Sequence, residues 1–522
     1  MDRRTLLAIT LCFLIYVGWQ KYYLEPRLHT QTQEQGAETS SRSGEIARSK
    51  ATSETTLRLP PQSTAHHSHP SKKITLSTET GESLINEEGP FFSNWTLKGY
   101  KLGISQDAAA VDMHSVTHES GEVTLAFDDP NFSYLHDVQG KLERTAIGAT
   151  WTYEDAQVKL SREFFSTDRQ PYIDARVTAE FKNRTPKYAF LYINSQSLDK
   201  EPEAQDRQLV YWANESIERF PLHDKLEQRA SSASVKYVAA TNRYFIMALV
   251  AQAPLTPEAL IQPTGPNAGR ASLVYPITGK TMSLPVRVYF GPKELEILRR
   301  VEPTLDHTVD FGWFTICAYP LLKTLKWFYQ FVQNYGLAII LLTLLLKVCT
   351  YPLTYKSMKS MKKMAKLQPQ LQKLRERYKD DRETLNKEML TMMRNNGYNP
   401  MAGCLPMIIQ MPIFFALYRV LYSSIELYHA PFAFWIKDLS SHDPFYVTPI
   451  LLSFTMFIQQ KLTPNTATDP AQARMMQLMP LIFGAFMLAL PAGLTIYMLV
   501  NALASIAQQM ILNKKLDPLS SR

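Results

Sequence analysis

Apolar residues follow two contrasting patterns along the chain. Long unbroken apolar runs occur near the N-terminus and after residue 336, whereas the region between them alternates apolar and polar positions. Long runs are typical of membrane-spanning helices, and alternation with a period of two is typical of half-buried β-strands. The pattern therefore predicts membrane spans on both sides of a β-rich domain.

Six apolar runs predict a polytopic α-helical membrane protein with about six spans. They are Thr5–Trp19, Gly336–Pro352, Leu405–Ser424, Val447–Gln460, Met475–Leu490 and Leu494–Leu512. Arg3 and Arg4 precede the first run and place the N-terminus in the cytoplasm. The alternative for this run is a cleaved signal peptide, but no small-residue cleavage site follows Trp19. We therefore interpret residues 1–24 as an uncleaved transmembrane anchor.

The region between the first two runs divides into a linker and an all-β domain. Residues 25–73 are rich in polar residues and proline and predict a disordered linker. From 74 to 305 short alternating segments such as Tyr172–Phe181 are separated by turn residues, which predicts an antiparallel sandwich. The domain contains no nucleophile elbow, phosphate loop or metal-ligand cluster, so no catalytic residue, metal site or cofactor is predicted.

Residues 306–334 predict an amphipathic helix that lies along the membrane surface. Trp313, Phe314 and Trp327 contribute aromatic side chains, and Lys323 and Lys326 lie among them. A core helix of the sandwich is the alternative, but the aromatic content and the position just before a span favour the surface.

A strongly basic stretch predicts a cytoplasmic helical hairpin at 356–398. Its two halves carry apolar residues at helical spacing, as in Leu367 and Leu371 and in Met389 and Met392. The candidate docking residues are Lys362, Lys363, Lys366, Lys373, Arg375 and Arg377. The hairpin either is a solvated element that only fixes topology, or is a docking surface for an incoming chain or for ribosomal RNA.

Composition and charge further restrict the possible classes of protein. A mean hydropathy of −0.19 requires a large aqueous part beside the spans. The net charge of +8 comes from basic residues next to the spans, which is the positive-inside pattern and not a footprint for specific DNA binding. The short basic tail 513–522 keeps the C-terminus in the cytoplasm, so the large β-domain lies on the other side of the membrane.

One cation interrupts the second apolar run. Lys347 lies about 15 Å into that span at about 1.5 Å per residue, close to the bilayer midplane, where a cation costs about 2.5–3.5 kcal/mol. The alternative is a lysine that extends to the cytoplasmic headgroups from a span that begins near Trp327. The next basic cluster starts only at Lys356, which favours the midplane position.

Lys347 has no acidic partner in the later spans, which contain neither Asp nor Glu. The polar residues that could face it are uncharged: Thr343 on its own helix and Gln410, Tyr418, Gln459, Gln460, Thr495, Tyr497, Asn501 and Gln508 on the others. We infer a hydrated cavity inside the membrane, lined by neutral side chains around one cation.

Several motifs in the last third of the chain resemble the insertase core of the YidC/Oxa/Alb family of membrane protein insertases. They include Tyr351-Pro352-Leu353-Thr354, Asn399-Pro400-Met401-Ala402-Gly403-Cys404, Gln410-Met411-Pro412-Ile413-Phe414 and Pro491-Ala492-Gly493-Leu494. Upstream, Phe290-Gly291-Pro292-Lys293-Glu294 and Val309-Asp310-Phe311-Gly312-Trp313 resemble members from double-membraned bacteria, whose periplasmic domain is a β-supersandwich.

The resemblance implies a five-helix core at 335–512 that inserts membrane segments through a hydrophilic groove open to the cytoplasm and to lipid. Most members carry Arg where this chain has Lys347, and Thr343 and Tyr497 match groove and substrate-facing positions of the family. The implied partners are nascent inner-membrane proteins, the lipid bilayer, the ribosome and the Sec translocon. The implied location is the bacterial inner membrane with both termini in the cytoplasm.

Two other functions remain as alternatives. An ion-coupled transporter usually needs intramembrane carboxylates, and the spans have none. A membrane-anchored carbohydrate-modifying enzyme is suggested by sandwich folds that resemble mutarotases, but no convergent His/Glu site is present in the sequence.

Overall fold

The computed structural model describes residues 72–516, apart from 90, 118–122, 137, 198–205, 224–225, 232, 379–380, 396–399 and 464–469. The predicted anchor at 1–24, almost all of the linker at 25–73 and most of the tail at 513–522 lie outside these residues. The chain divides into two compact units, 1–58 with 469–475 and 59–468 with 476–522. The elements below, apart from the first turns of α10, belong to the second unit.

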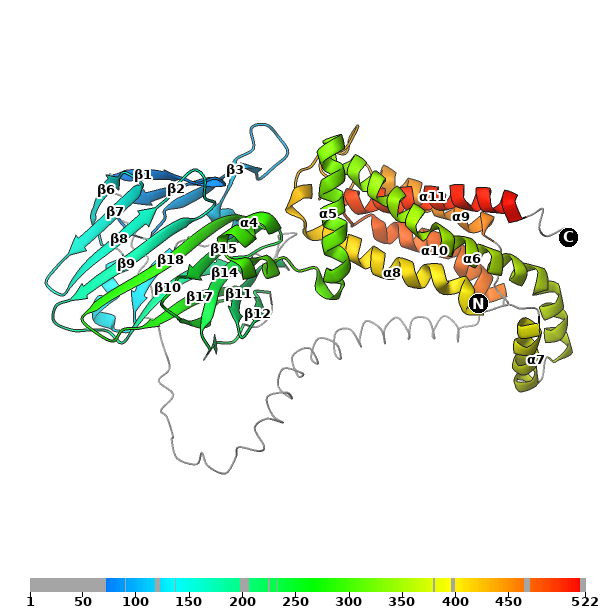
Figure 1. Cartoon of the computed structure of the whole chain (residues 1–522), viewed down its shortest axis with the longest axis horizontal. Coiled ribbons are helices and arrows are strands. Elements are labelled where there is room, and N and C mark those ends of the chain that lie inside the picture. The colour runs from blue at the N-terminus through cyan, green and yellow to red at the C-terminus, as the bar shows by residue number, and fades with distance from the viewer. Residues whose placement is uncertain are drawn as a thin grey trace, which may run out of the picture. The chain divides into compact units, whose positions relative to one another are not determined.

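Three antiparallel sheets make up the β-domain (Figure 1). The first has the order β1 (Lys73–Ser77), β2 (Gly81–Asn86), β3 (Asn94–Lys101) and β4 (Ala110–Asp112). The second has the order β13 (Arg229–Ala230), β16 (Glu258–Gly265), β17 (Ala268–Pro276), β10 (Tyr188–Gln196) and β5 (Val123–Phe127). The third has the order β12 (Ser216–Pro221), β11 (Gln208–Ala213), β14 (Val235–Thr241), β15 (Phe245–Ala251), β18 (Thr281–Pro292), β9 (Ile173–Phe181), β8 (Val158–Phe165), β7 (Gly148–Glu154) and β6 (Lys141–Thr145). The all-β prediction for this region is confirmed.

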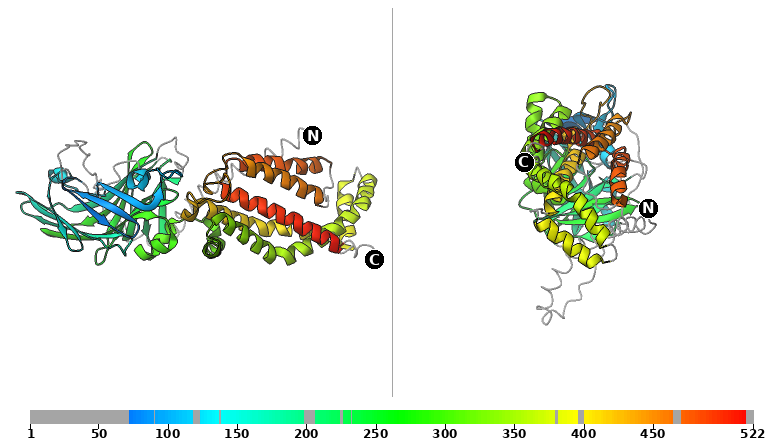
Figure 2. Two further views of the ribbon diagram at one scale, coloured as in Figure 1. Left: turned by 90° about the horizontal axis from the view of Figure 1, so that it is seen from above. Right: turned by 90° about the vertical axis from the view of Figure 1, so that its right-hand side faces the viewer.

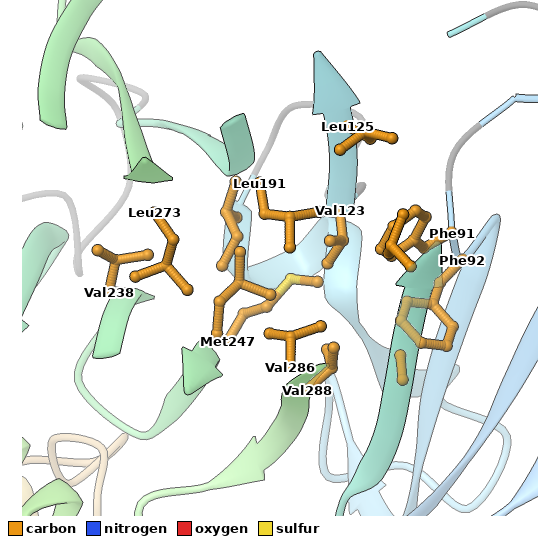
Figure 3. Close-up of a cluster of buried hydrophobic side chains, with 14 of the residues drawn as sticks. Phe91, Phe92, Val123, Leu125, Leu191, Val238, Met247, Leu273, Val286 and Val288 are labelled. Carbon is orange, nitrogen blue, oxygen red and sulfur yellow. The ribbon is translucent and has the colours of Figure 1, made fainter. Parts of the chain in front are cut away.

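The core of the β-domain forms where the two larger sheets face each other (Figure 3). Val123 and Leu191 of the five-stranded sheet point toward Met247, Val286 and Val288 of the nine-stranded sheet. Each such side chain removed from water contributes about 1.5–3 kcal/mol, so this contact stabilises the domain. The period of two in the sequence is the direct cause, because it gives each strand one apolar face.

Strand β15 is buried on both faces, unlike a simple sandwich strand. Phe245, Met247 and Leu249 belong to the core between the sheets. Ile246 and Ala248 belong to a second cluster that also contains side chains of the helices that follow the sheet. The continuous apolar run of β15 therefore reflects a strand covered on two sides.

Two short helices, α3 (Met113–Thr117) and η2 (Pro130–His136), lie between strands of the β-domain. Further helices connect the β-domain to the helical part. After β18 come α4 (Leu295–Val301), η4 (Pro303–Thr308), η5 (Gly312–Phe314) and the amphipathic α5 (Thr315–Val332). On α5, Leu322 and Leu325 are buried, whereas Ile316, Trp327 and Phe331 are 88%, 52% and 68% exposed. One face of α5 thus packs on protein and the other presents large apolar side chains.

The last third of the chain is helical: α6 (Tyr335–Arg377), α7 (Arg382–Asn395), α8 (Pro400–Ser423), η6 (Ile425–Leu427), α9 (Val447–Leu462), α10 (Pro470–Met487) and α11 (Ala492–Leu516). Helix α11 packs against α6 and α9, and α5 packs against α6 and α8 (Figure 2). Gly336 allows a close approach, because a Cβ atom there would lie 2.0 Å from the Phe432 ring.

Two helices among the described residues are long and apolar enough to cross a membrane, at Tyr335–Lys363 and Ala492–Lys514. Helix α6 continues without interruption from the apolar run into the first arm of the basic hairpin, although Pro352 and Pro369 lie inside it. The sequence predicted a span and a separate hairpin here. Around Pro369 the stretch keeps strong helix formers, such as Leu367, Gln368 and Leu371, which favours one continuous helix there.

Candidate functional site

Lys347 lies on the part of α6 that faces α11. Its Nζ donates a hydrogen bond to Ser505 Oγ at 2.7 Å, and the side chain is half-buried. Among the described residues no carboxylate forms an ion pair with it, and its two other ammonium hydrogens have no protein partner. A half-buried cation without an acid requires neutral dipoles or water. The hydrated cavity inferred from the sequence stays a prediction.

Ser505 serves as a neutral bridge at this position. Its hydroxyl donates to Asn501 O at 2.8 Å, one turn earlier on α11, and so presents a lone pair to Lys347. Gln508 Nε2 donates to the backbone carbonyl of Lys347 at 3.2 Å. Asn501, Ser505 and Gln508 recur at spacings of four and three, which places them on one face of α11.

Ser505 was missed by the sequence analysis. Asn501 was named as a groove residue, but in the structure its backbone carbonyl, not its amide group, takes part in the contact. Asn501 and Gln508 lie seven residues apart in the sequence and share one helical face. Ser505 lies between them on the same face, and this spacing could have indicated that it also faces Lys347.

A second polar contact joins α8 to α11. Gln410 Nε2 donates to the hydroxyl of Tyr497 at 2.8 Å, and Tyr497 is only 1% exposed. Two predicted residues, one on α8 and one on α11, are thereby brought together. Tyr418, also on α8, stacks on Tyr422 one turn later with ring centroids 5.6 Å apart.

The two predicted threonines are buried and bonded to their own helices. Thr343 Oγ1 donates to Ile339 O at 2.7 Å, and Thr495 Oγ1 donates to Pro491 O at 3.1 Å. Their exposures are 1% and 0%. Such back-bonding satisfies the hydrogen of each hydroxyl locally, and neither threonine accepts a described hydrogen bond from Lys347.

The loop after α8 closes the end of the helices opposite the basic hairpin. Asn334 Nδ2 donates to Phe432 O at 2.9 Å, at the start of α6. Ala492 N donates to Ser441 O at 2.7 Å, and Gly493 N donates to Leu439 O at 3.0 Å, at the start of α11. The segment 424–446 is therefore fixed to both helices that carry the Lys347 site.

The basic hairpin at the other end exposes most of its predicted docking residues. Leu367 and Leu371 pack against Met389 and Met392, as the spacing predicted. The side chains of Lys363, Lys366, Lys373 and Arg377 are exposed, whereas Lys362 donates to Asn513 O at 3.3 Å. The side chain of Arg375 lies outside the described part of the hairpin.

Within the described residues, no group of three or more His, Cys, Asp or Glu side chains could hold a metal ion.

Comparisons with known proteins identify the family. Residues 327–519 match the model of the 60Kd inner membrane protein family, and residues 73–324 match the YidC periplasmic domain. The membrane protein insertase YidC of Geobacter metallireducens is 32% identical over 99% of both chains. That of Maridesulfovibrio salexigens is 34% identical over 97% of this chain and 98% of its own.

Among solved structures, an active YidC insertase with its first transmembrane domain resolved is 19% identical. The similarity covers 86% of this chain and 94% of that one, with a TM-score of 0.36. The two sequence relatives decide the assignment: the chain belongs to the YidC family of membrane protein insertases, a family of inner-membrane proteins with a β-rich periplasmic domain that is not a class of enzymes.

Proposed function

We propose that the chain inserts nascent membrane segments through a hydrated groove bordered by α6, α8 and α11, with Lys347 as its single cation. The observation that carries the proposal is the contact of Lys347 Nζ with a hydroxyl at 2.7 Å in place of a carboxylate. A cation held by a neutral partner keeps its charge available to a passing group. The groove residues Gln410, Tyr497, Asn501 and Tyr418 complete a neutral polar path.

Electrostatics explains how such a groove would act. Two opposite unit charges 4 Å apart attract by about 1 kcal/mol in water and by about 4 kcal/mol at an effective dielectric constant of 20. A carboxylate in the leading tail of a substrate is therefore drawn toward Lys347 more strongly inside the groove than in the cytoplasm. The same field repels basic segments, which agrees with their retention in the cytoplasm.

The proposed topology has about six spans, formed by residues 1–24 and by α6, α8, α9, α10 and α11. The basic hairpin and both termini are cytoplasmic, and the β-domain and segment 424–446 are periplasmic. Helix α5 lies at the periplasmic surface of the membrane. In Figure 1, α5 runs across the direction of α8 and α11, and its exposed Ile316, Trp327 and Phe331 would enter the lipid.

We further propose that the basic hairpin is a docking surface for the ribosome and that the chain works alone or with the Sec translocon. The exposed lysines of the hairpin support this, because clustered cations bind the phosphate backbone of RNA. The hairpin would then deliver the emerging segment to the cytoplasmic end of the groove.

The groove route can be tested by disulfide cross-linking in proteoliposomes that contain the purified full chain. Asn501→Cys, in a background without native cysteines, should cross-link to a cysteine in the membrane segment of a translated substrate. The matched control is Ile482→Cys on α10, whose side chain is 63% exposed on an apolar surface. Equal cross-linking at both positions would contradict the groove route, even if insertion itself is observed.

A further inference from the structure

A cavity of about 570 Å³ lies where the β-domain meets the ends of the helices opposite the basic hairpin. Its walls come from the β14–β15 turn with Arg243, from Arg207, from Tyr422 at the end of α8, from segment 424–446 and from the turn between α10 and α11. It is separate from the Lys347 groove, and neither the predicted site nor the proposed function uses it. Its volume is suited to a small molecule or to a lipid headgroup.

Arg243 gives the cavity a cation with unused hydrogen-bonding capacity. Its Nε donates to Tyr422 O at 2.6 Å, and its guanidinium carbon lies 3.5 Å from the centre of the Tyr422 ring. These contacts fix the plane of the guanidinium. Its Nη2 is buried and has no hydrogen-bond partner among the described residues, and no described carboxylate forms an ion pair with Arg243. A buried donor left unsatisfied costs about 1–3 kcal/mol. Because no described carboxylate offsets the charge of Arg243, its guanidinium would attract an anion that enters the cavity.

A second guanidinium lines the same cavity. Arg207 is only 2% exposed and donates through Nη2 to Ser115 O at 3.1 Å. Two arginines therefore line one cavity, and a planar guanidinium can bind two oxygens of a phosphate group at once.

Two described carboxylates at or near the cavity accept hydrogen bonds from neutral groups, and neither forms an ion pair with a described arginine. Asp438 accepts hydrogen bonds from Ser440 Oγ at 2.6 Å and Ser441 Oγ at 2.7 Å, and it lies 3.8 Å from His429 Nε2. Asp206 accepts from the hydroxyl of Tyr422 at 3.0 Å. These contacts leave Arg243 as the group best placed to bind an anion from outside the protein.

Apolar residues that follow α10 also line the cavity. Leu490 and Pro491 line it, and nearby on α10 the side chains of Ile482 and Phe486 are 63% and 65% exposed. Under the proposed topology, on which this step rests, that surface faces the acyl chains of the periplasmic leaflet. The combination of a cationic end and an apolar end fits an amphiphilic anion.

We propose that this cavity binds the phosphate group of an anionic phospholipid from the periplasmic leaflet, with Arg243 as the principal ligand and Arg207 as the second cation. Bound lipid would fill the space between the β14–β15 turn and the α10–α11 turn and join the β-domain to the helices. Inorganic phosphate shares the same recognition chemistry and is the other possible source of the bound group.

The test measures binding directly on the purified full chain in phosphatidylcholine nanodiscs. Short-chain phosphatidylglycerol, short-chain phosphatidylcholine and inorganic phosphate are titrated separately, and binding is read by native mass spectrometry. Arg243→Gln should weaken phosphatidylglycerol binding by about tenfold or more, because a charge-assisted hydrogen bond is lost. Arg176→Gln, which removes an exposed arginine of β9, is the matched control and should change nothing.

A second variant separates binding from folding. Leu102 lines the cavity and is 52% exposed, so Leu102→Trp narrows the cavity without removing a charge or a buried side chain. It should also weaken phosphatidylglycerol binding. Unchanged binding in both variants, or equal binding of the two lipids by the native chain, would overturn the proposal. Tight binding of inorganic phosphate alone would reject the lipid as the source. Because the readout is binding and not insertion, failure of the groove mechanism leaves this result unaffected.

Discussion

Lys326 of α5 lies 3.5 Å from the carboxylate of Glu426, which follows α8 and is buried. The same ammonium lies 3.0 Å from Glu294 and 3.4 Å from Glu296. Burial alone would lower the pKa of Lys326, but the surrounding carboxylates raise it above its usual value. Burial raises the pKa of Glu426, and Lys326 only partly offsets that effect. One lysine therefore compensates the buried acid and joins it to α5 and to the start of α4.

Replacing this lysine should destabilise the protein in a pH-dependent way. Lys326→Met should cost about 2–3 kcal/mol at neutral pH, less than the 3–5 kcal/mol typical of breaking a fully buried pair, since Lys326 is partly exposed. The pKa of Glu426 is raised in the folded state, so its stabilising contribution is present at low pH and is lost as the pH rises through that folded pKa. The defect should therefore be larger at pH 8 than at pH 5, measured as the apparent melting temperature in detergent.

The second substitution Glu426→Gln provides the control for this interpretation. In the Lys326→Met background it should restore most of the lost melting temperature, because the buried charge is gone. If the double variant is as unstable as the single one at every pH, packing of the lysine side chain and not charge compensation is the cause.

The β-domain should modulate insertion and not perform it. It has no catalytic constellation in its sequence, and the proposed groove lies wholly in the helices. Deletion of residues 74–290 removes nearly all of the strands. It retains α4 with Glu294 and Glu296, so the ion pairs of Lys326 with these residues can still form. Insertion in a depletion strain should remain largely intact. Complete loss of insertion by a variant that is still abundant and correctly oriented would mean that the groove alone is not sufficient.

Topology can be read from single cysteines in a cysteine-free background. Lys373→Cys, an exposed position of the basic hairpin, should react with an impermeant maleimide only after the inner membrane is permeabilised. Glu258→Cys, at an exposed position of β16, is the periplasmic counterpart and should react in intact spheroplasts. Labelling of position 373 from the periplasmic side would reverse the proposed orientation.

Periodicity explains why the elements were predictable and the contacts were not. The alternation in Tyr172–Phe181 reports local geometry, and β9 buries every second side chain as expected. The spacing of Leu367, Leu371, Met389 and Met392 likewise predicted the hairpin packing. By contrast, Lys347 and Ser505 are 158 residues apart, and no local pattern specifies that pairing. The same holds for the Lys326 cluster, where three acids from two segments converge on one lysine.

The strongest prediction concerns the charge of Lys347. If the groove acts by attracting acidic tails, the requirement is charge and not the contact with Ser505. Lys347→Arg should keep insertion near the native rate, because the guanidinium carries the same charge with more donors. Lys347→Ala should slow insertion of a substrate with an acidic tail by about tenfold, which corresponds to about 1.4 kcal/mol. Lys347→Glu should be slower still, because it repels that tail.

Two controls distinguish this mechanism from a purely structural role of Lys347. Ser505→Ala removes the bridge but keeps the cation, so it should insert acidic tails at close to the native rate. A matched substrate whose tail is neutral should be far less sensitive to Lys347→Ala than the acidic one, at equal levels of protein. On the structural alternative, in which Lys347 only joins α6 to α11, Ser505→Ala and Lys347→Ala would impair both substrates alike and lower protein abundance. Full activity of Lys347→Glu would remove Lys347 from the mechanism, since no electrostatic attraction survives reversal of its sign.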